Sequence, residues 1–206
     1  MEPLFDLDHR IVAIGTGAST SAIVDRLLRL HAAKQRSRRI TLYVVGTTAE
    51  MPPLSAGDAL LLADVLRSIA PPIRTVGFGL LTGWQPVLLA CGTRGERYML
   101  THSLVAAGPL DWTGLTLPKN SIGLQSPAHP TTLIRQQLDR QVQALFTELK
   151  LVPDLFARHH LLTAQEAIAN GLTDHVVERQ LTLRLDHPHS RAGQKTVEIP
   201  PHETLL

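Results

Sequence analysis

The sequence contains one cysteine, Cys91, so a disulfide bond cannot form within a single chain. This excludes the small secreted domains that disulfide bonds stabilise, and it favours a reducing, cytoplasmic setting. Long apolar runs are also missing, because no stretch approaches the roughly 18 residues that indicate a membrane-spanning helix. The first eight residues are acidic, whereas a signal peptide begins with basic ones. We therefore expect a cytoplasmic protein that is neither exported nor anchored in a membrane.

Charged and aromatic side chains are scarce. Asp, Glu, Lys and Arg make up 18% of the 206 residues and aromatic residues 4%, whereas charged residues are roughly 25% of a typical soluble domain. The net charge is only +2, so no broad basic surface for nucleic acids is expected. The length suits one domain. A surface with so little charge is expected if other subunits cover part of it.

Short β-type runs alternate with helical patterns in the first half of the chain. Strands are predicted at residues 10–15, 40–45 and 73–79, and helices at residues 20–30 and 54–69. Ser19, Thr20 or Ser21 can cap the first helix. The 40–45 run lacks polar alternation, as in a strand buried on both faces. The alternation predicts right-handed βαβ crossovers and a largely parallel sheet.

The second half begins with a short apolar helix at residues 84–91, a strand at 97–100 and a loop-rich stretch at 108–130. Apolar residues at helical spacing then predict a long amphipathic helix at 131–150. Thr163 is expected to cap a helix over 164–170, which Gly171 ends before a strand at 173–177. We expect one α/β domain over residues 1–180 and a partly ordered C-terminal tail over 181–206.

Three stretches, taken together, resemble the proteolytic subunit of the Clp protease. They are residues 10–57, with Arg10-Ile-Val, Ile40-Thr-Leu-Tyr-Val and Ser55-Ala-Gly; residues 79–103, with Arg97-Tyr-Met-Leu; and residues 162–177. Their order and spacing extend the resemblance over about residues 8–178. The resemblance implies the α/β spiral of βαβ units that Clp subunits share with the crotonase family. It also implies that the helix at 131–150 is a protruding handle, the element by which two seven-membered rings interlock.

The family cleaves peptides with a Ser-His-Asp triad, in which the histidine takes the serine proton and the aspartate orients the imidazole. The resemblance places the serine position at Gly83, four residues after Gly79. It places the histidine position at Gly108, and the aspartate position at His159. None of these three residues can take the role that its position has in the family. We therefore predict a degenerate catalytic site.

The family's oxyanion loop also differs in this chain. The resemblance implies a Pro-Gly-Gly segment after the strand at 40–45, whose N–H groups stabilise the tetrahedral intermediate. Here residues 46–54 are about three residues longer and lack a Gly-Gly pair. Pro52 and Pro53 have no backbone N–H. The loop is therefore expected to lack the donors that catalysis needs.

These observations predict a proteolytically inactive Clp-type subunit, a structural or regulatory component of a heptameric or tetradecameric ring. The expected partners are further copies of the chain and catalytic Clp proteolytic subunits, with an AAA+ unfoldase as a further candidate through the ring. The segment Met1–His9 is short for an axial pore loop, which weakens the case for direct unfoldase contact. No cofactor, metal ion, nucleic acid or membrane is expected. A homo-oligomeric scaffold without Clp partners stays open.

Two enzymatic alternatives also stay open. A crotonase-like acyl-CoA enzyme would have Gly79 and Gly83 in register with that family's glycine-rich motif. However, residues 84–86 replace the remaining glycines, and the chain is short of the usual C-terminal helices. A hydrolase with a rebuilt site could use side chains near the old one, namely Ser55, Thr82, His102 and Ser103.

The histidines give only weak signals for a metal site. His159 and His160 are adjacent, so on a helix their rings would diverge by about 100°. His187, His189 and His202 lie in the tail without a supporting carboxylate cluster. Cys91 is expected to be a small buried apolar residue with an inert thiol.

Overall fold

The computed structural model of the chain describes residues 10–15, 17–33, 38–46, 54–112 and 130–177. At residues 130–135, 137 and 138 it describes the backbone alone. The predicted boundary at residue 180 and the tail at 181–206 lie outside the described residues. The same holds for Pro52, Pro53 and the three tail histidines.

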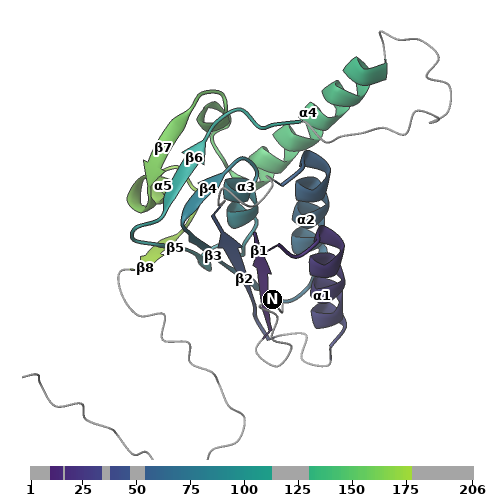
Figure 1. Cartoon of the computed structure of the whole chain (residues 1–206), viewed down its shortest axis with the longest axis vertical. Helices are drawn as coiled ribbons and strands as arrows, with labels where there is room; N and C mark the ends of the chain where they lie inside the picture. The colour runs from purple at the N-terminus through teal and green to yellow at the C-terminus, as the bar shows by residue number, and fades with distance from the viewer. Residues whose placement is uncertain (1–9, 16, 34–37, 47–53, 113–129, 178–206) are drawn as a thin grey trace, which may run out of the picture.

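A five-stranded parallel sheet forms the centre of the fold (Figure 1). Its order is β1 (Ile11–Ile14), β2 (Ile40–Val45), β3 (Ile73–Phe78), β5 (Arg97–Leu100) and β8 (His175–Val177). The first helices are α1 (Thr20–Ala32), α2 (Ala56–Ser68) and α3 (Gln85–Ala90). All of these elements lie where the sequence predicted them, to within a few residues. Of the three candidate caps of α1, Ser19 is the one whose side chain accepts the N–H of Ala22.

The main core lies between one face of this sheet and the helices. Val12, Val44 and Met99 point from the strands toward Leu27 of α1 and Leu62 of α2, and all five are fully buried. Because successive strand residues point to opposite faces, the other face carries a separate, smaller cluster. On β2 that face holds Thr41 and Val45, which are half-buried. The expectation that β2 is buried on both faces is confirmed for Tyr43, which is 9% exposed on the second face, but not for Thr41 and Val45, since no described helix covers that face.

A second, three-stranded sheet was not predicted. It consists of β4 (Leu80–Thr82), β6 (Leu104–Ala107) and β7 (His160–Thr163). β4 pairs with β6 in parallel and β6 with β7 in the antiparallel sense. Strands of three or four residues are too short for a periodicity to be recognised. Their pairing, between residues up to about 60 positions apart, depends on the tertiary fold.

The long helix is α4 (Pro130–Leu149), which extends away from the two sheets as a handle (Figure 1). Among the residues of α4 whose side chains are described, Val142, Leu145 and Phe146 are buried in the core. The Phe146 ring contacts Phe156 at a centroid distance of 4.8 Å, in the 3-10 turn Pro153–Phe156. The predicted protruding helix is thus confirmed by the direction of α4, whose N-terminal part extends away from the sheets (Figure 1).

The last helix, α5 (Ala164–Ala169), begins with a capping box. Thr163 accepts the N–H of Glu166, and the Glu166 carboxylate accepts the N–H of Thr163. These hydrogen bonds from Thr163 lower the pKa of Glu166. Gly171 has a φ of +75°, the left-handed conformation that ends the helix. The cap and the stop are those that the sequence predicted.

Candidate functional site

Gly83 lies in the turn between β4 and α3, directly before Trp84, the N-cap residue of α3. Its φ is +55°, a conformation that favours glycine. A Cβ atom added to Gly83 would meet nothing within 4 Å. A side chain at this position would therefore project into open space, and its main cost would be backbone strain.

Gly108 and His159 lie directly against each other. The antiparallel register pairs Ala107 of β6 with His160 of β7, which places Gly108 opposite His159 one step further along. A Cβ atom added to Gly108 would lie 2.7 Å from Nδ1 of His159. The exposed imidazole of His159 thus fills the space next to Gly108. Gly108 and His159, which are 51 positions apart in the sequence, become neighbours through one strand pair.

The three-stranded sheet brings all three predicted positions to one edge. The parallel register pairs Thr82 with Ala106, so Gly83 lies beyond the C-terminal end of β4, beside the end of β6. Gly108 follows β6, and His159 precedes the antiparallel β7. The sequence named these positions by resemblance alone, while their juxtaposition comes from a sheet that the sequence did not predict. Their assignment as the triad positions stays a prediction.

The groups at this edge offer little nucleophilic chemistry. Gly83 and Gly108 have no side chains, and His159 supplies an imidazole. An imidazole can accept or donate a proton, but a serine-type mechanism also needs a hydroxyl within hydrogen-bond reach of it. None of these three positions provides a hydroxyl or a carboxylate.

Side chains that the sequence analysis did not single out hold this edge together. The buried amide of Gln85 donates to the carbonyl of Val45 at 2.8 Å and accepts the N–H of Thr82 at 3.0 Å. The Trp84 indole donates to the carbonyl of Asp111, and its ring meets Trp112 edge to face at 5.5 Å. The end of β2, the start of α3 and the segment after Gly108 are thereby joined. No local pattern could reveal contacts between residues 27 and 40 positions apart.

The residues considered for a rebuilt site have other contacts. Ser55 is the N-cap of α2, where it accepts the N–H of Asp58 and donates to the Asp58 carboxylate. Ser103 is buried and accepts the N–H of Gly79 at 3.1 Å. His102 is exposed in the turn before β6, at the opposite end of that strand from Gly108. The fold therefore places His102 and Ser103 at the opposite end of β6 from Gly108. Thr82, the fourth candidate, directly precedes Gly83 and lies at the edge occupied by Gly83, Gly108 and His159, where its N–H donates to Gln85.

Comparison with known proteins gives a consistent result. The model of the family described as Clp protease matches residues 6–180. The chain belongs to the Clp protease family. It is 30% identical over 195 residues to the ATP-dependent Clp protease proteolytic subunit 2 of Thermobifida fusca, covering 86% of this chain and 88% of that one. It is 31% identical over 178 residues to the subunit 2 of Nocardia farcinica, covering 83% and 82%.

A third relative has similar coverage. The ATP-dependent Clp protease proteolytic subunit 1 of Prochlorococcus marinus is 28% identical over 179 residues, covering 84% of this chain and 86% of that one. The α/β fold agrees with membership of the Clp family. The family consists of serine peptidases, and the match does not favour the crotonase-like alternative.

Two sequence segments that carry the resemblance meet at an ion pair. Arg97 of β5 is 7% exposed and forms a bidentate contact with Asp174, with atom distances of 2.9 and 2.5 Å. Arg97 also donates to the carbonyl of Gly171, while the N–H of Gly95 donates to Asp174. Burial raises the pKa of Asp174, but the hydrogen bonds and charge of Arg97 outweigh it and lower the pKa overall. This pair therefore has a structural role, fastening β8 to β5.

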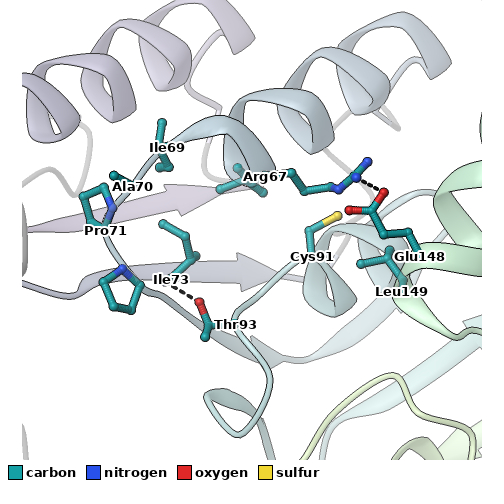
Figure 2. A pocket seen from close by; sticks show the side chains of 11 residues that line it. Arg67, Ile69, Ala70, Pro71, Ile73, Cys91, Thr93, Glu148 and Leu149 are labelled. Atoms are coloured by element: carbon teal, nitrogen blue, oxygen red, sulfur yellow. Dashed lines mark hydrogen bonds and ion pairs between the residues drawn. The ribbon is translucent and has the colours of Figure 1, made fainter.

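A surface pocket of about 370 Å³ lies between the C-terminal ends of α2 and α4, and Gly83, Gly108 and His159 are not among the residues that line it (Figure 2). Ile69, Pro71 and Ile73 form much of its wall, and the Arg67–Glu148 ion pair crosses one side. The Cys91 side chain points toward this pair, and the residue is 6% exposed. Burial raises the pKa of the Cys91 thiol to about 12. The thiol is therefore almost entirely protonated at neutral pH.

Cys91 is expected to resist alkylation in the native protein. Because the thiolate is the reactive form, iodoacetamide at pH 8 should modify native Cys91 more than about 100-fold more slowly than the urea-unfolded chain. Mass spectrometry of timed samples measures both rates. Rapid modification of the folded protein would show that the thiol is neither buried nor inert.

Within the described ranges, no helix is long and apolar enough to cross a membrane. The same residues contain no group of three or more His, Cys, Asp or Glu side chains arranged to hold a metal ion.

Proposed function

We propose that this chain is a proteolytically inactive Clp subunit. In this proposal it is a cytoplasmic, structural or regulatory component of a ring, in which it assembles with copies of itself and with catalytic Clp subunits. It contributes architecture rather than peptide-bond cleavage. The observation that carries the proposal is Gly83, which offers no nucleophile at the turn before α3.

The neighbouring residues support the same reading. Gly108 has no imidazole to accept a proton from a nucleophile, and His159 has no carboxylate to orient one. Two other observations concern the rest of the chain. The apolar core and the Arg97–Asp174 pair are intact, and α4 extends freely as a handle. The chain therefore keeps the features that build a subunit, while the three predicted triad positions lack the groups that cleave peptides.

The purified chain is expected to show no labelling by a fluorophosphonate probe and no hydrolysis of fluorogenic peptides. The physical reason is that the probe reacts only with an activated serine. In-gel fluorescence and a peptidase assay measure this, with an active serine peptidase treated in parallel. Labelling of the native chain that disappears after heat denaturation would contradict the proposal.

A Gly83→Ser variant gives a sharper form of the same test. The new hydroxyl would project into open space, but Gly108 offers no base to activate it. The variant is therefore expected to remain unlabelled, and peptidase activity should stay at background. Labelling of Gly83→Ser would contradict a fully degenerate site, and its loss in Gly83→Ser/His159→Ala would identify the His159 imidazole, which lies against Gly108, as the base.

The chain is expected to form an assembly several times its 22.5 kDa mass, alone or after mixing with a catalytic Clp subunit. The low surface charge and the protruding α4 favour contact between subunits. Multi-angle light scattering measures the mass, and mass spectrometry of the peak identifies its subunits. A monomeric mass under both conditions would contradict the ring, while leaving the inactivity of the site unaffected.

A further inference from the structure

The pocket between the ends of α2 and α4 combines an apolar wall with one charged end (Figure 2). Its volume of about 370 Å³ lies within the roughly 300–1,000 Å³ that small-molecule sites occupy. Ile69, Pro71 and Ile73 belong to the wall, and Arg67 and Glu148 form the charged end. Apolar walls with a few polar groups at one end are typical of sites for small amphipathic molecules.

The two groups of the charged end differ in how far solvent reaches them. The Arg67 side chain, in the last turn of α2, is 29% exposed, whereas the Glu148 side chain is 59% exposed. A guanidinium group matches a carboxylate in both geometry and charge. Glu148 therefore occupies the place on Arg67 that the carboxylate of a ligand would take. As the more exposed partner, Glu148 is the one that can turn away into solvent.

The charges next to this end of the pocket favour an anionic ligand. Arg94 donates to the last carbonyl of α4 at 3.4 Å, and Lys150 directly follows that helix. Together with Arg67 they give three positive side chains, against Glu148 and Asp64, which lies one turn before Arg67 on α2. The C-terminal ends of two helices disfavour an anion. Arg94 already compensates this effect at the end of α4.

The wall offers no free backbone donor between residues 69 and 73. Each N–H of this segment already has an acceptor: Val65 for Ile69, His31 for Ala70 and Thr93 for Ile73. Pro71 and Pro72 have no N–H. A peptide bound along this wall would bury carbonyl groups without donors, which is costly. An aliphatic chain needs no donor, so the wall suits a hydrocarbon tail.

We propose that this pocket binds a small aliphatic carboxylate, such as a short- or medium-chain fatty acid, with its carboxylate on Arg67 and its chain along the apolar wall. Glu148 is then an internal competitor, which fills the anion position in the free chain and turns into solvent when the ligand binds. The site is independent of the proposed inactivity, because the pocket shares no lining residue with the turn at Gly83.

Titration of the full-length chain with sodium octanoate tests this site by isothermal calorimetry, at concentrations that do not form micelles. Octan-1-ol has a chain of the same length without the charge, and acetate has the charge without the chain. Octanoate is expected to bind at least about tenfold more tightly than either, because it alone engages both Arg67 and the wall. Equal affinities for octanoate and octan-1-ol would overturn the proposal, since the charge would then contribute nothing.

A peptide is the other possible source of a carboxylate with an apolar tail. N-acetyl-leucyl-leucine, with a free carboxyl terminus, is expected to bind at least about tenfold more weakly than octanoate, because its amide carbonyls find no donor on the wall. Binding as tight as that of octanoate, or tighter, would assign the pocket to the carboxyl terminus of a peptide and overturn the proposal.

Two substitutions at the charged end have opposite expected effects on octanoate binding. Arg67→Met keeps an apolar stem without the charge and should weaken binding by about tenfold or more. Glu148→Gln removes the competing carboxylate and should tighten binding by about threefold or more. The matched control, Arg29→Met, breaks the exposed pair with Asp25 on α1 and should leave the affinity unchanged. Damage to the fold cannot tighten binding, so an unchanged or weaker affinity in Glu148→Gln would overturn the proposal even if Arg67→Met fails to fold.

Methyl NMR of the full-length chain, labelled at its isoleucine δ1 methyl groups, locates the ligand. Octanoate is expected to shift the signals of Ile69 and Ile73, which line the pocket, and not that of Ile23, which α1 contributes to the main core. The variants Ile69→Val and Ile73→Val assign the two signals. Shifts that leave both signals in place and move others would put the ligand elsewhere and overturn the proposal.

Discussion

Replacing Asp174 with asparagine is expected to lower the free energy of unfolding by about 3 kcal/mol, because removing one partner leaves a buried charge without compensation. Arg97 is 7% exposed, and an asparagine amide at position 174 would offer its guanidinium a weaker, neutral hydrogen-bond acceptor in place of the carboxylate. For a domain of this size, the loss corresponds to a fall in melting temperature of roughly 6–12 °C. Circular dichroism or differential scanning fluorimetry measures this shift.

The matched control is Asp25→Asn. Asp25 forms an ion pair with Arg29 on the surface of α1, where the two side chains are 61% and 70% exposed. Exposed pairs of this spacing contribute roughly 0.3–0.5 kcal/mol. A loss for Asp174→Asn no larger than that for Asp25→Asn would show that the Arg97 contact contributes little.

The same pair predicts a dependence on pH. The folded pKa of Asp174 is lowered, so its contribution is fully present above the unfolded pKa of roughly 3.9 and is lost as pH falls through the folded value. The stability difference between the wild type and Asp174→Asn should therefore be constant near neutral pH and shrink below about pH 4. Melting curves of both proteins from pH 7 to pH 3 measure it.

Gly46→Ala is expected to lower the free energy of unfolding by more than about 3 kcal/mol, at least as much as Asp174→Asn. The added methyl group would overlap backbone atoms in a packed interior, and these atoms cannot move aside at low cost. Gly46 is buried at the end of β2 and its N–H donates to Phe78 at 2.8 Å. An added Cβ would lie 2.5 Å from the backbone nitrogen of Leu80 and 2.7 Å from its oxygen. Neither atom can move without separating β2 from β4.

Gly95→Ala serves as the control for that substitution. Gly95 has a φ of +80° but no atom within 4 Å of an added Cβ, so only the backbone strain of about 1 kcal/mol is expected. Soluble yield and urea unfolding of the two variants measure the difference. If Gly46→Ala unfolds at the same urea concentration as Gly95→Ala, the two sheets are not in close contact at Gly46.

Gly46 also links stability to the candidate site. The contact at Leu80 sets the distance between the five-stranded sheet and β4, and β4 leads directly to Gly83. A perturbation here is therefore expected to shift Gly83 relative to Gly108 and His159. The buried Gln85 amide, which binds Val45 and Thr82, fixes the same junction from the other side.

The strands and helices around the main core could be predicted from the sequence because each carries a local signal. The β-branched run of β2 and the apolar spacing of α4 are examples, and so are the Thr163 cap and the Gly171 stop of α5. The resemblance to Clp subunits then gave Gly83, Gly108 and His159 as candidate positions. These conclusions needed only the order of residues along the chain, since periodicity and capping are local properties.

The tertiary structure alone decided which distant residues meet. The sheet of β4, β6 and β7 was not predicted, because a strand of three or four residues has no measurable periodicity and gains its stability from its partners. Its register places Gly108 against His159. In the same way, the sequence indicated an apolar β2, but only the arrangement of the helices determined that the described helices cover one face of the parallel sheet and not the other. Helices can cover a face only where the crossover connections carry them, and that is a property of the whole chain.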